Sequence, residues 1–352
     1  MKRAFQEFGD PIYETGVQPI HYAAITGNLR MYKFISERVE YNCQRYPSWC
    51  ISSPSNYASR YGNMEVLKFI MEECDFSQKF STEDLDGVPH DNPKPIPDLP
   101  SKTGITPLHS AAIGGHLEIY KYLAEKMVDK NPGFKGGMTH GLTPLHSAAA
   151  RGHLEMCRYI LSNVSEKNPG NRNGETPLHC AALNGHLDVY KLIAEQLDQS
   201  DRNPARTNGG TPLHNAAKDG HLNIVEYILA QVNDKNPKRT YYYSIYHTQD
   251  WNKRNFTQLH TASYYGHYEV YKYIGDNVVD KNPRNGHGWT PLHSAASFGN
   301  VEICEYILEN LNDKSCILGS NPSPLKLASD AKNLEIVELI QSAIDGEKGV
   351  KV

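Results

Sequence analysis

The feature that most constrains the fold of this chain is a short string that recurs along its whole length. Thr-Pro-Leu-His-x-Ala-Ala begins at Thr106, Thr143, Thr176, Thr211 and Thr290. Weaker copies begin at residues 18, 53, 257 and 323, which makes nine copies in 352 residues. Successive copies are most often 33 residues apart, with larger steps of 53 and 46 residues after the second and sixth copies. A fixed period of this length predicts a stack of similar supersecondary units with two insertions.

The copy that begins at Thr106 shows why each unit should be a helical hairpin. The Thr106 hydroxyl can cap a helix start, and Pro107 suits the first helical position, where a backbone N–H would have no partner. Gly115 can end this short helix because glycine takes the left-handed conformation at low cost. A second amphipathic helix follows from Leu117, and the stretch that begins at Asp129 has turn composition. The sequence therefore predicts an all-α stack of about nine helix-turn-helix units.

This pattern resembles the ankyrin repeat, whose signature is the same Thr-Pro-Leu-His string at the same period. The resemblance covers residues from about 16 to 344. It implies a right-handed ankyrin solenoid with projecting β-hairpin loops, in which partners usually dock on the concave face. The second copy departs from the pattern at Ser55 and Asn56. The ninth departs at Lys326 and Lys332, as suits a polar terminal repeat.

The copies and the insertions predict six segments. These are repeats 1 and 2 (1–74), a proline-rich acidic insertion loop (75–100), repeats 3 to 6 (101–237), a tyrosine-rich insertion finger (238–254), repeats 7 to 9 with a C-terminal cap (255–345) and a short tail (346–352). Five prolines in the first insertion argue against a helix or a central strand, so we expect an extended, exposed loop. The aromatic composition of the second insertion favours a β-hairpin.

Composition and charge exclude several classes of function. The formal net charge of -4 gives no general attraction for nucleic-acid phosphates or anionic membranes. No apolar run approaches the ~18 residues of a membrane span, and the first residues lack the hydrophobic region of a secretory signal. Seven cysteines without a framework favour a reducing compartment. We therefore expect a cytoplasmic or nuclear protein, a monomer, that binds neither nucleic acid nor membranes.

The residues that could form catalytic or metal sites are explained by the repeat. Twelve of the sixteen histidines lie either at the fourth motif position or after the helix-ending glycine. We interpret these as hydrogen-bonding partners of turn backbone and of the capping threonine. The other four, at 90, 140, 247 and 287, form no cluster with metal-ligand spacing. No nucleophile elbow or phosphate-binding loop occurs, so the sequence predicts a protein that is not an enzyme and uses no cofactor or metal.

Function is expected where aromatic and basic residues gather without being required by the repeat. In repeats 7 and 8, the positions that form the concave face in this family hold Lys253, Arg254, Phe256, Tyr264, Tyr265, His287, Trp289 and Phe298. Exposed aromatic residues are enriched among binding hot spots. With Tyr242, Tyr246 and Trp251 of the finger, these residues form the predicted site for a protein partner. The alternative is that finger and aromatic residues pack on each other as an internal core.

Two hypotheses on function follow. The first is a protein–protein interaction scaffold or adaptor that binds a partner of unknown identity on the concave face. The alternative is a small-ligand sensor, in which Trp289 and Phe256 stack a nucleotide base and Lys253 and Arg254 pair with its phosphates. A weaker candidate patch on the first two repeats consists of Tyr22, Tyr57, Arg60 and Tyr61. Its alternative is that these residues compensate within the core for the irregular second copy.

Four loop asparagines carry a separate hypothesis. Equivalent loop positions hold Asn131, Asn168, Asn236 and Asn282. The resemblance makes them candidate modification sites, because ankyrin-loop asparagines at this place are hydroxylated by an asparaginyl hydroxylase in animals. Plain turn chemistry of the Asn-Pro pair is the favoured alternative.

Overall fold

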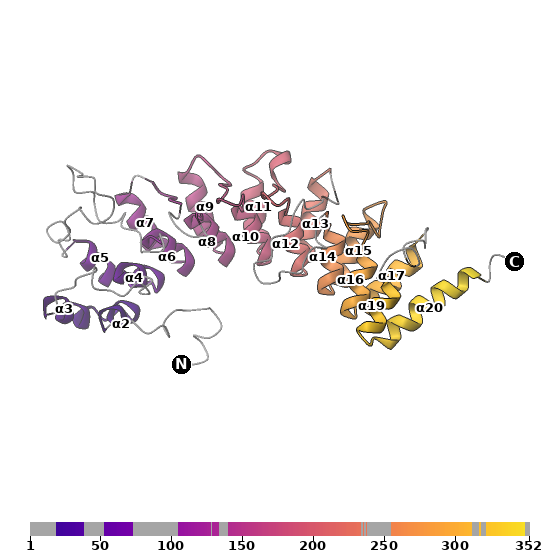
Figure 1. Cartoon of the computed structure of the whole chain (residues 1–352). Helices are drawn as coiled ribbons and strands as arrows, with labels where there is room; N and C mark the ends of the chain where they lie inside the picture. Colours follow the sequence, from indigo (N-terminus) through magenta and orange to yellow (C-terminus); the bar gives the residue numbers. More distant parts are fainter. Residues whose placement is uncertain are drawn as a thin grey trace, which may run out of the picture. The chain divides into compact units, whose positions relative to one another are not determined.

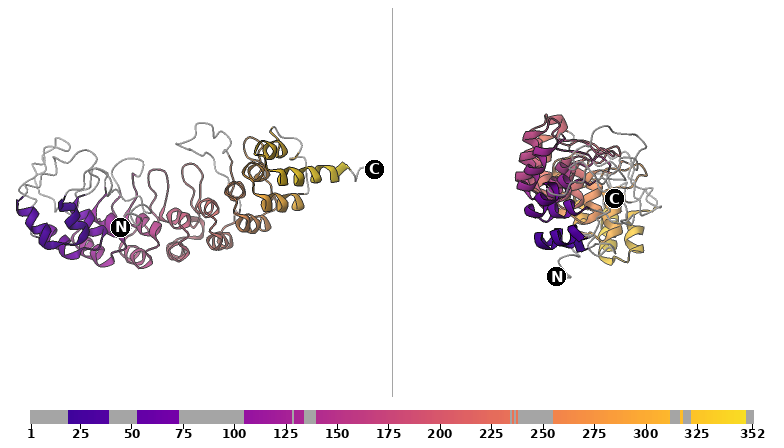
Figure 2. Two further views of the ribbon diagram at one scale, coloured as in Figure 1. Left: turned by 90° about the horizontal axis from the view of Figure 1, so that it is seen from below. Right: turned by 90° about the vertical axis from the view of Figure 1, so that its left-hand side faces the viewer.

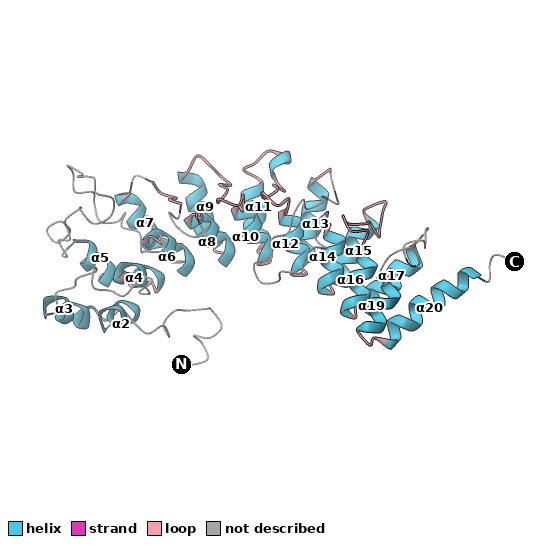
Figure 3. Ribbon diagram, in the orientation of Figure 1, coloured by secondary structure: helices cyan, strands magenta, loops and turns pink. Residues whose placement is uncertain are grey.

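Helices are the only regular elements in the described part of the chain. The computed structural model describes residues 19–38, 53–72, 105–127, 129–133, 140–233, 235, 237, 255–311, 317 and 322–348. These residues form α-helices and one short 3-10 helix, as Figure 3 shows. The chain divides into two compact units, Met1–Arg172 and Asn173–Val352.

In the first unit, the described helices form two rows. They are α2 (Pro19–Thr26), α3 (Leu29–Arg38), α4 (Pro54–Arg60), α5 (Met64–Glu72), α6 (Pro107–Gly114), α7 (Leu117–Lys126), α8 (Pro144–Arg151) and α9 (Leu154–Asn163). The helices that begin each copy of the motif, α2, α4, α6 and α8, pack on one another in succession and form an inner row (Figure 1). Each is followed by a helix of the outer row.

The second unit repeats this arrangement. Its described helices are α10 (Pro177–Leu183), α11 (Leu187–Ala194), η6 (Gln199–Asp201), α12 (Pro212–Lys218), α13 (Leu222–Gln231), α14 (Gln258–Tyr265), α15 (Tyr268–Asp276), α16 (Pro291–Phe298), α17 (Val301–Asn310), α19 (Pro324–Asp330) and α20 (Leu334–Lys348). The inner row is α10, α12, α14, α16 and α19, and the outer row is α11, α13, α15, α17 and α20. The loop between α11 and α12 projects away from the helices (Figure 2).

Each inner helix from α6 to α16 begins with the same histidine-based cap. At α6, Nδ1 of His109 accepts a hydrogen bond from the Thr106 N–H at 3.3 Å and lies 2.9 Å from Thr106 Oγ1. Because Nδ1 accepts this bond, the neutral ring carries its proton on Nε2. Nε2 lies 3.0 Å from the carbonyl oxygen of Leu142, which precedes the next inner helix. Burial lowers the pKa of His109 to about 3, so the ring stays neutral at physiological pH.

A second set of polar side chains ties helix pairs to the pairs before them. Nε2 of His153 lies 3.2 Å from the carbonyl oxygen of Ile113, near the end of the previous inner helix. The last carbonyls of a helix lack partners within the helix, so these contacts satisfy them. Gly115 has a φ of 74°, and a Cβ there would lie 2.6 Å from the His153 ring. Glycine is therefore required both by the left-handed backbone and by the close approach of this histidine.

The first insertion does not interrupt the inner row. The Asn56 side chain of α4 donates to the carbonyl oxygen of Ile105 at 3.2 Å, and His116 Nε2 lies 3.0 Å from the carbonyl oxygen of Arg60. Ser53 caps α4, so the second copy forms its helices despite Ser55 and Asn56. Residues 75–100 and 238–254, predicted as a loop and a finger, lie outside the described residues.

The predicted β-hairpin loops are not confirmed, since no strand occurs among the residues that the structure describes. Two described loops are instead closed by short turns with two backbone bonds each. In one, Arg206 N–H donates to Gly210 and Gly209 N–H to Arg206; in the other, Asn285 N–H donates to Trp289 and Gly288 N–H to Asn285. At the C-terminal end, α20 continues through Lys348, three residues into the segment predicted as a tail.

Candidate partner-binding surface

Three aromatic side chains at the ends of two consecutive inner helices form an exposed cluster in the second unit. Tyr264 and Tyr265 end α14, and Phe298 ends α16. The Tyr264 ring lies 4.2 Å from the Phe298 ring and 4.9 Å from the Tyr265 ring, measured between centroids. Tyr265 is 44% exposed and Phe298 is 53% exposed. We call Tyr264, Tyr265 and Phe298 the aromatic cluster.

The repeat does not require aromatic residues at these positions. Tyr265 and Phe298 are each eight residues after their capping threonine, and the same position in the preceding copies holds Thr26, Tyr61, Gly114, Arg151, Asn184 and Asp219, of which only Tyr61 is aromatic. α14 and α16 pack on each other, which brings the two aromatic ends together. Five of the six preceding copies therefore form their inner helix without a large ring at this position.

One basic residue beside the cluster was absent from the predicted site. Lys218 ends α12, and its Nζ lies 5.8 Å from the centroid of the Tyr265 ring. Lys218 occupies the same position in its copy as Tyr264 does in the next one. An alignment of the copies could therefore have placed Lys218 beside the predicted site. An ammonium group over an aromatic face is attracted by the ring quadrupole. The cluster thus has a positive charge at one edge.

Phe256 and Trp289, predicted in the same site, serve the helix caps instead. Each directly precedes a capping threonine, and each ring packs on the histidine of its own motif. The Phe256 ring lies 4.7 Å from the ring of His260, and the Trp289 ring is stacked 5.6 Å from that of His293. Phe256 is only 8% exposed and Trp289 is half-buried. These rings therefore offer little surface compared with the aromatic cluster.

The remaining predicted site residues are divided between a loop and undescribed segments. His287 is exposed on the loop before α16, and its N–H donates to Asn285 Oδ1 at 2.9 Å. The other five, Lys253, Arg254, Tyr242, Tyr246 and Trp251, lie outside the described residues. Of the predicted site, the structure brings together Tyr264, Tyr265 and Phe298.

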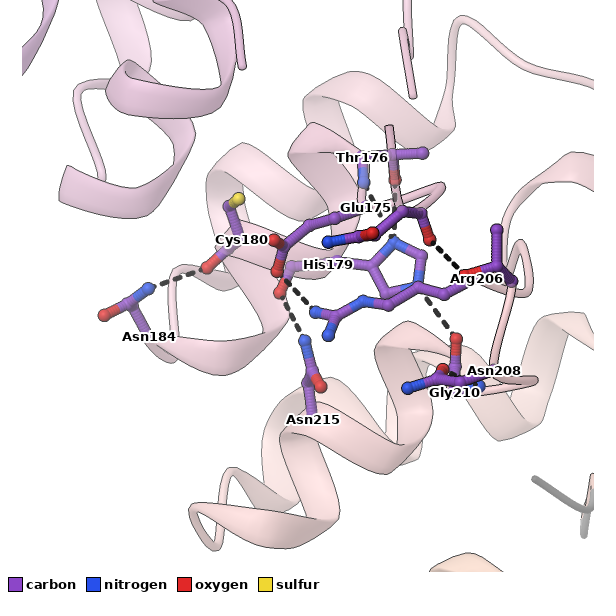
Figure 4. A network of polar contacts seen from close by, with 11 residues as sticks. Glu175, Thr176, His179, Cys180, Asn184, Arg206, Asn208, Gly210 and Asn215 are labelled. Atoms are coloured by element: carbon purple, nitrogen blue, oxygen red, sulfur yellow. Dashed lines mark hydrogen bonds and ion pairs between the residues drawn. The ribbon is translucent and has the colours of Figure 1, made fainter. Parts of the chain in front are cut away.

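The inner row preceding the cluster carries a network of polar side chains rather than aromatic ones (Figure 4). An ion pair joins Arg206 Nη2 to Glu175 Oε1 at 2.5 Å, and Asn215 donates to the carbonyl oxygen of His179 at 3.0 Å. Cys180 lies in the same network, where burial and then Glu175 raise the pKa of its thiol. Cys180 is therefore a thiol and not a thiolate nucleophile at neutral pH. The chemistry of this region is structural.

The weaker patch on the first two copies contains one buried residue, one exposed residue and two half-buried residues, Arg60 and Tyr61. Tyr57 is 5% exposed, and its ring lies 5.6 Å from that of His21. Tyr22 is 51% exposed on α2. Tyr22 is thus a lone exposed aromatic residue on an inner helix and is useful for comparison with Tyr265.

The described loop asparagines have a structural role. Asn131 Oδ1 accepts a hydrogen bond from the Leu145 N–H at 3.0 Å, and Asn282 Oδ1 accepts one from the Leu292 N–H at 3.1 Å. These N–H groups belong to the second residue of an inner helix, where the helix itself supplies no acceptor. Asn168 is half-buried, and Asn236 lies outside the described part of the chain. Hydroxylation of these asparagines stays a prediction.

Two further properties bear on function. Within the described ranges, no group of three or more His, Cys, Asp or Glu side chains is arranged to hold a metal ion. None of the described helices combines the length and the apolar character that crossing a membrane requires.

Comparison with known families agrees with the fold and the caps. The family model described as "Ankyrin repeats (3 copies)" matches residues 55–169, 126–203, 162–240, 196–285 and 259–349. Among curated proteins, no match is found. The family matches together run from residue 55 to residue 349 and coincide with the helix pairs and capping histidines described above. The chain therefore belongs to the ankyrin-repeat family.

Proposed function

We propose that this protein is a non-enzymatic scaffold or adaptor that binds a protein partner on the concave face of its repeats, with the aromatic cluster as the main contact. Ankyrin repeats are generally protein–protein interaction modules. The observation that carries the proposal is the exposure of Tyr265 and Phe298 beside the half-buried Tyr264. At the same position, the only aromatic residue among the preceding copies is Tyr61, which is half-buried.

The geometry of the cluster suits a binding hot spot. Tyr264 contacts both neighbours, so the three rings support one another before any partner arrives. Aromatic side chains offer a large contact area with few rotatable bonds, and ordering them in advance lowers the entropic cost of association. Lys218 at the edge adds a charge that favours one orientation of the partner.

The extent of the contact is proposed to cover several repeats. We interpret the successive helix pairs as nine repeats, and a stable protein interface buries on the order of 1,600 Å² in total. The aromatic cluster alone is too small for that area, so neighbouring inner-helix ends and loop tips, including His287, would contribute. We place this function in the cytoplasm or nucleus and in a monomeric protein.

The nucleotide-sensor alternative has no support. It requires Phe256 and Trp289 to hold a base between them, yet Phe256 is buried and Trp289 stacks on His293. On the ring faces that contact His260 and His293, a base would have to displace the capping histidines of α14 and α16.

The experiment compares capture of partners by matched variants of the full chain. The test variant is Tyr265→Ala/Phe298→Ala, and the control is Tyr22→Ala, which removes an exposed inner-helix ring from the first unit. After partners have been cross-linked to the chain, we expect wild type and control to retain the same proteins. The amount retained by the test variant should be lower by about tenfold or more. Thermal melting of all three should agree. Equal retention by the test variant would overturn the proposal.

A further inference from the structure

The outer helices alternate in a two-repeat pattern. Among the first eight outer helices, counting from the first residue of each, position four is tyrosine in every second one: Tyr32 in α3, Tyr120 in α7, Tyr190 in α11 and Tyr271 in α15. In the outer helix that follows each of these, position four holds a residue without a ring and position six is aromatic: Leu67 and Phe69, Cys157 and Tyr159, Val225 and Tyr227, Cys304 and Tyr306. Position six is also aromatic in α3, α7 and α15, so it is position four alone that alternates with a period of two repeats.

This alternation produces the same ring contact four times. The tyrosine at position four meets the aromatic ring at position six of the next outer helix, edge to face. The centroid distances and interplanar angles are 6.0 Å and 78° for Tyr32 and Phe69, 6.1 Å and 82° for Tyr120 and Tyr159, 6.0 Å and 80° for Tyr190 and Tyr227, and 5.9 Å and 81° for Tyr271 and Tyr306. Both units contain two such pairs, with nearly identical geometry.

A lysine strengthens most of these contacts. In three pairs, the residue after the tyrosine is a lysine whose Nζ lies over the aromatic ring of the following helix. The distances to the ring centroid are 4.8 Å for Lys33 over Phe69, 5.9 Å for Lys121 over Tyr159 and 5.6 Å for Lys191 over Tyr227. In the last pair, Lys281 takes this role over Tyr306 at 5.5 Å. Each pair is therefore joined by an edge contact and a cation contact on the same ring.

The junctions between pairs coincide with the irregularities of the chain. The two long insertions fall after α5 and after α13, each of which ends a pair. The division between the two compact units, at Arg172 and Asn173, falls after α9, which ends the remaining pair. At the two junctions that carry insertions, position four is Leu67 or Val225, so the same ring contact cannot form there.

We propose that the cooperative unit of this protein is a pair of consecutive repeats, and that the array opens first at the junctions between pairs. The inner row continues across the described junctions, since α4 packs on α6 and α12 packs on α14. α13 also contacts α15. The junctions at the insertions are joined by packing and by hydrogen bonds, including that from the Tyr122 hydroxyl to Glu72 Oε1 at 2.7 Å, but they lack a tyrosine at position four. A repeat array opens where the coupling between neighbours is weakest.

Hydrogen exchange of the full chain, resolved to individual helices, tests this proposal. In Tyr190→Leu, we expect exchange in α11 and α13 to rise together by about fivefold to tenfold, with α9 and α15 unchanged. The matched control Tyr190→Phe loses the hydroxyl bond to the Arg202 carbonyl oxygen but keeps the ring contact. In Tyr190→Phe, α11 and α13 should still exchange together. An increase confined to α11, or one that spreads evenly to α9 and α15, would overturn the proposal.

A second measurement needs no substitution. In wild type at increasing urea, the two outer helices of one pair should lose protection from hydrogen exchange at the same urea concentration. Different pairs should lose protection at different urea concentrations. The contact of α13 with α15 makes their junction the strictest place to look. Simultaneous loss of protection in α13 and α15, with α15 and α17 separate, would contradict the two-repeat unit.

Discussion

His214 Nε2 lies 3.2 Å from the carbonyl oxygen of Phe256, although 42 residues separate them. The equivalent bond from His109 to Leu142 spans 33 residues. The second insertion therefore lengthens the chain without changing the bond that joins one inner helix to the start of the next. It also explains why Phe256 is buried, because its backbone and its ring both serve the caps.

Acid should destabilise the protein between about pH 6.5 and pH 4. Burial lowers the pKa of His21 and His293 to about 4 and that of His109 to about 3, against 6.5 in the unfolded chain. Between these values the unfolded state binds more protons, so the free energy of unfolding falls as the pH falls. A tenfold difference in proton affinity between the folded and unfolded states corresponds to about 1.4 kcal/mol, so the loss should reach several kcal/mol.

Urea unfolding followed by circular dichroism at a series of pH values measures this loss. His293→Gln should reduce the dependence on pH, because it removes one of the buried histidines. Equal stability at about pH 7 and pH 5 would show that the capping histidines do not govern the acid response.

Asn282→Ala should lower the free energy of unfolding by about 1–2 kcal/mol, because the buried Leu292 N–H loses its acceptor. Thermal and urea unfolding would measure the change. Asn223→Ala is the control, since Asn223 is exposed and bonds only the next residue's N–H. Its effect should stay within about 0.5 kcal/mol. Equal effects of the two substitutions would refute the capping role.

Gly114→Ala should destabilise the protein, against the usual trend. Alanine in place of a helical glycine normally gains about 0.5–1 kcal/mol. Here an added Cβ would lie 2.2 Å from the carbonyl oxygen of Arg60 and 2.7 Å from the His116 ring. We expect a loss of about 1–3 kcal/mol, because α6 would have to move away from α4. A higher melting temperature for this variant would show that the two helices are not held at this spacing.

The described cysteines should resist alkylation in the folded protein. Burial raises the pKa of Cys157 and Cys304 to about 12, and burial with Glu175 raises that of Cys180. Peptide mapping after treatment with iodoacetamide at about pH 8 should show labelling at least a hundredfold slower than in urea. Rapid labelling of Cys180 in the folded protein would show that its network opens readily.

The helix starts and their caps could be predicted from sequence because they depend on local contacts. Thr106 and His109 are three residues apart, and their hydrogen bonds form within one turn. The structural interpretation of the motif histidines is confirmed for the same reason. The nature of the loops was not predictable in the same way. Backbone bonds such as that from Arg206 to Gly210 depend on the conformation of the whole loop.

The aromatic site shows where sequence reasoning stops. Four aromatic residues depart from the repeat: Phe256, Trp289, Tyr265 and Phe298. From the sequence alone, there is therefore the same reason to place each of them in the binding site. Only the packing of the helices separates them. Residues that precede the capping threonine fold onto its histidine, and residues that end the inner helix remain in solvent.

The repeat period, the helical hairpins and membership of the ankyrin family were determined by sequence alone, because each rests on interactions between residues close in the chain. Tertiary structure decided which aromatic residues are exposed, that Lys218 lies beside Tyr265, and that outer helices couple in pairs. Those relationships join residues of different repeats, and their distances depend on how consecutive helix pairs pack.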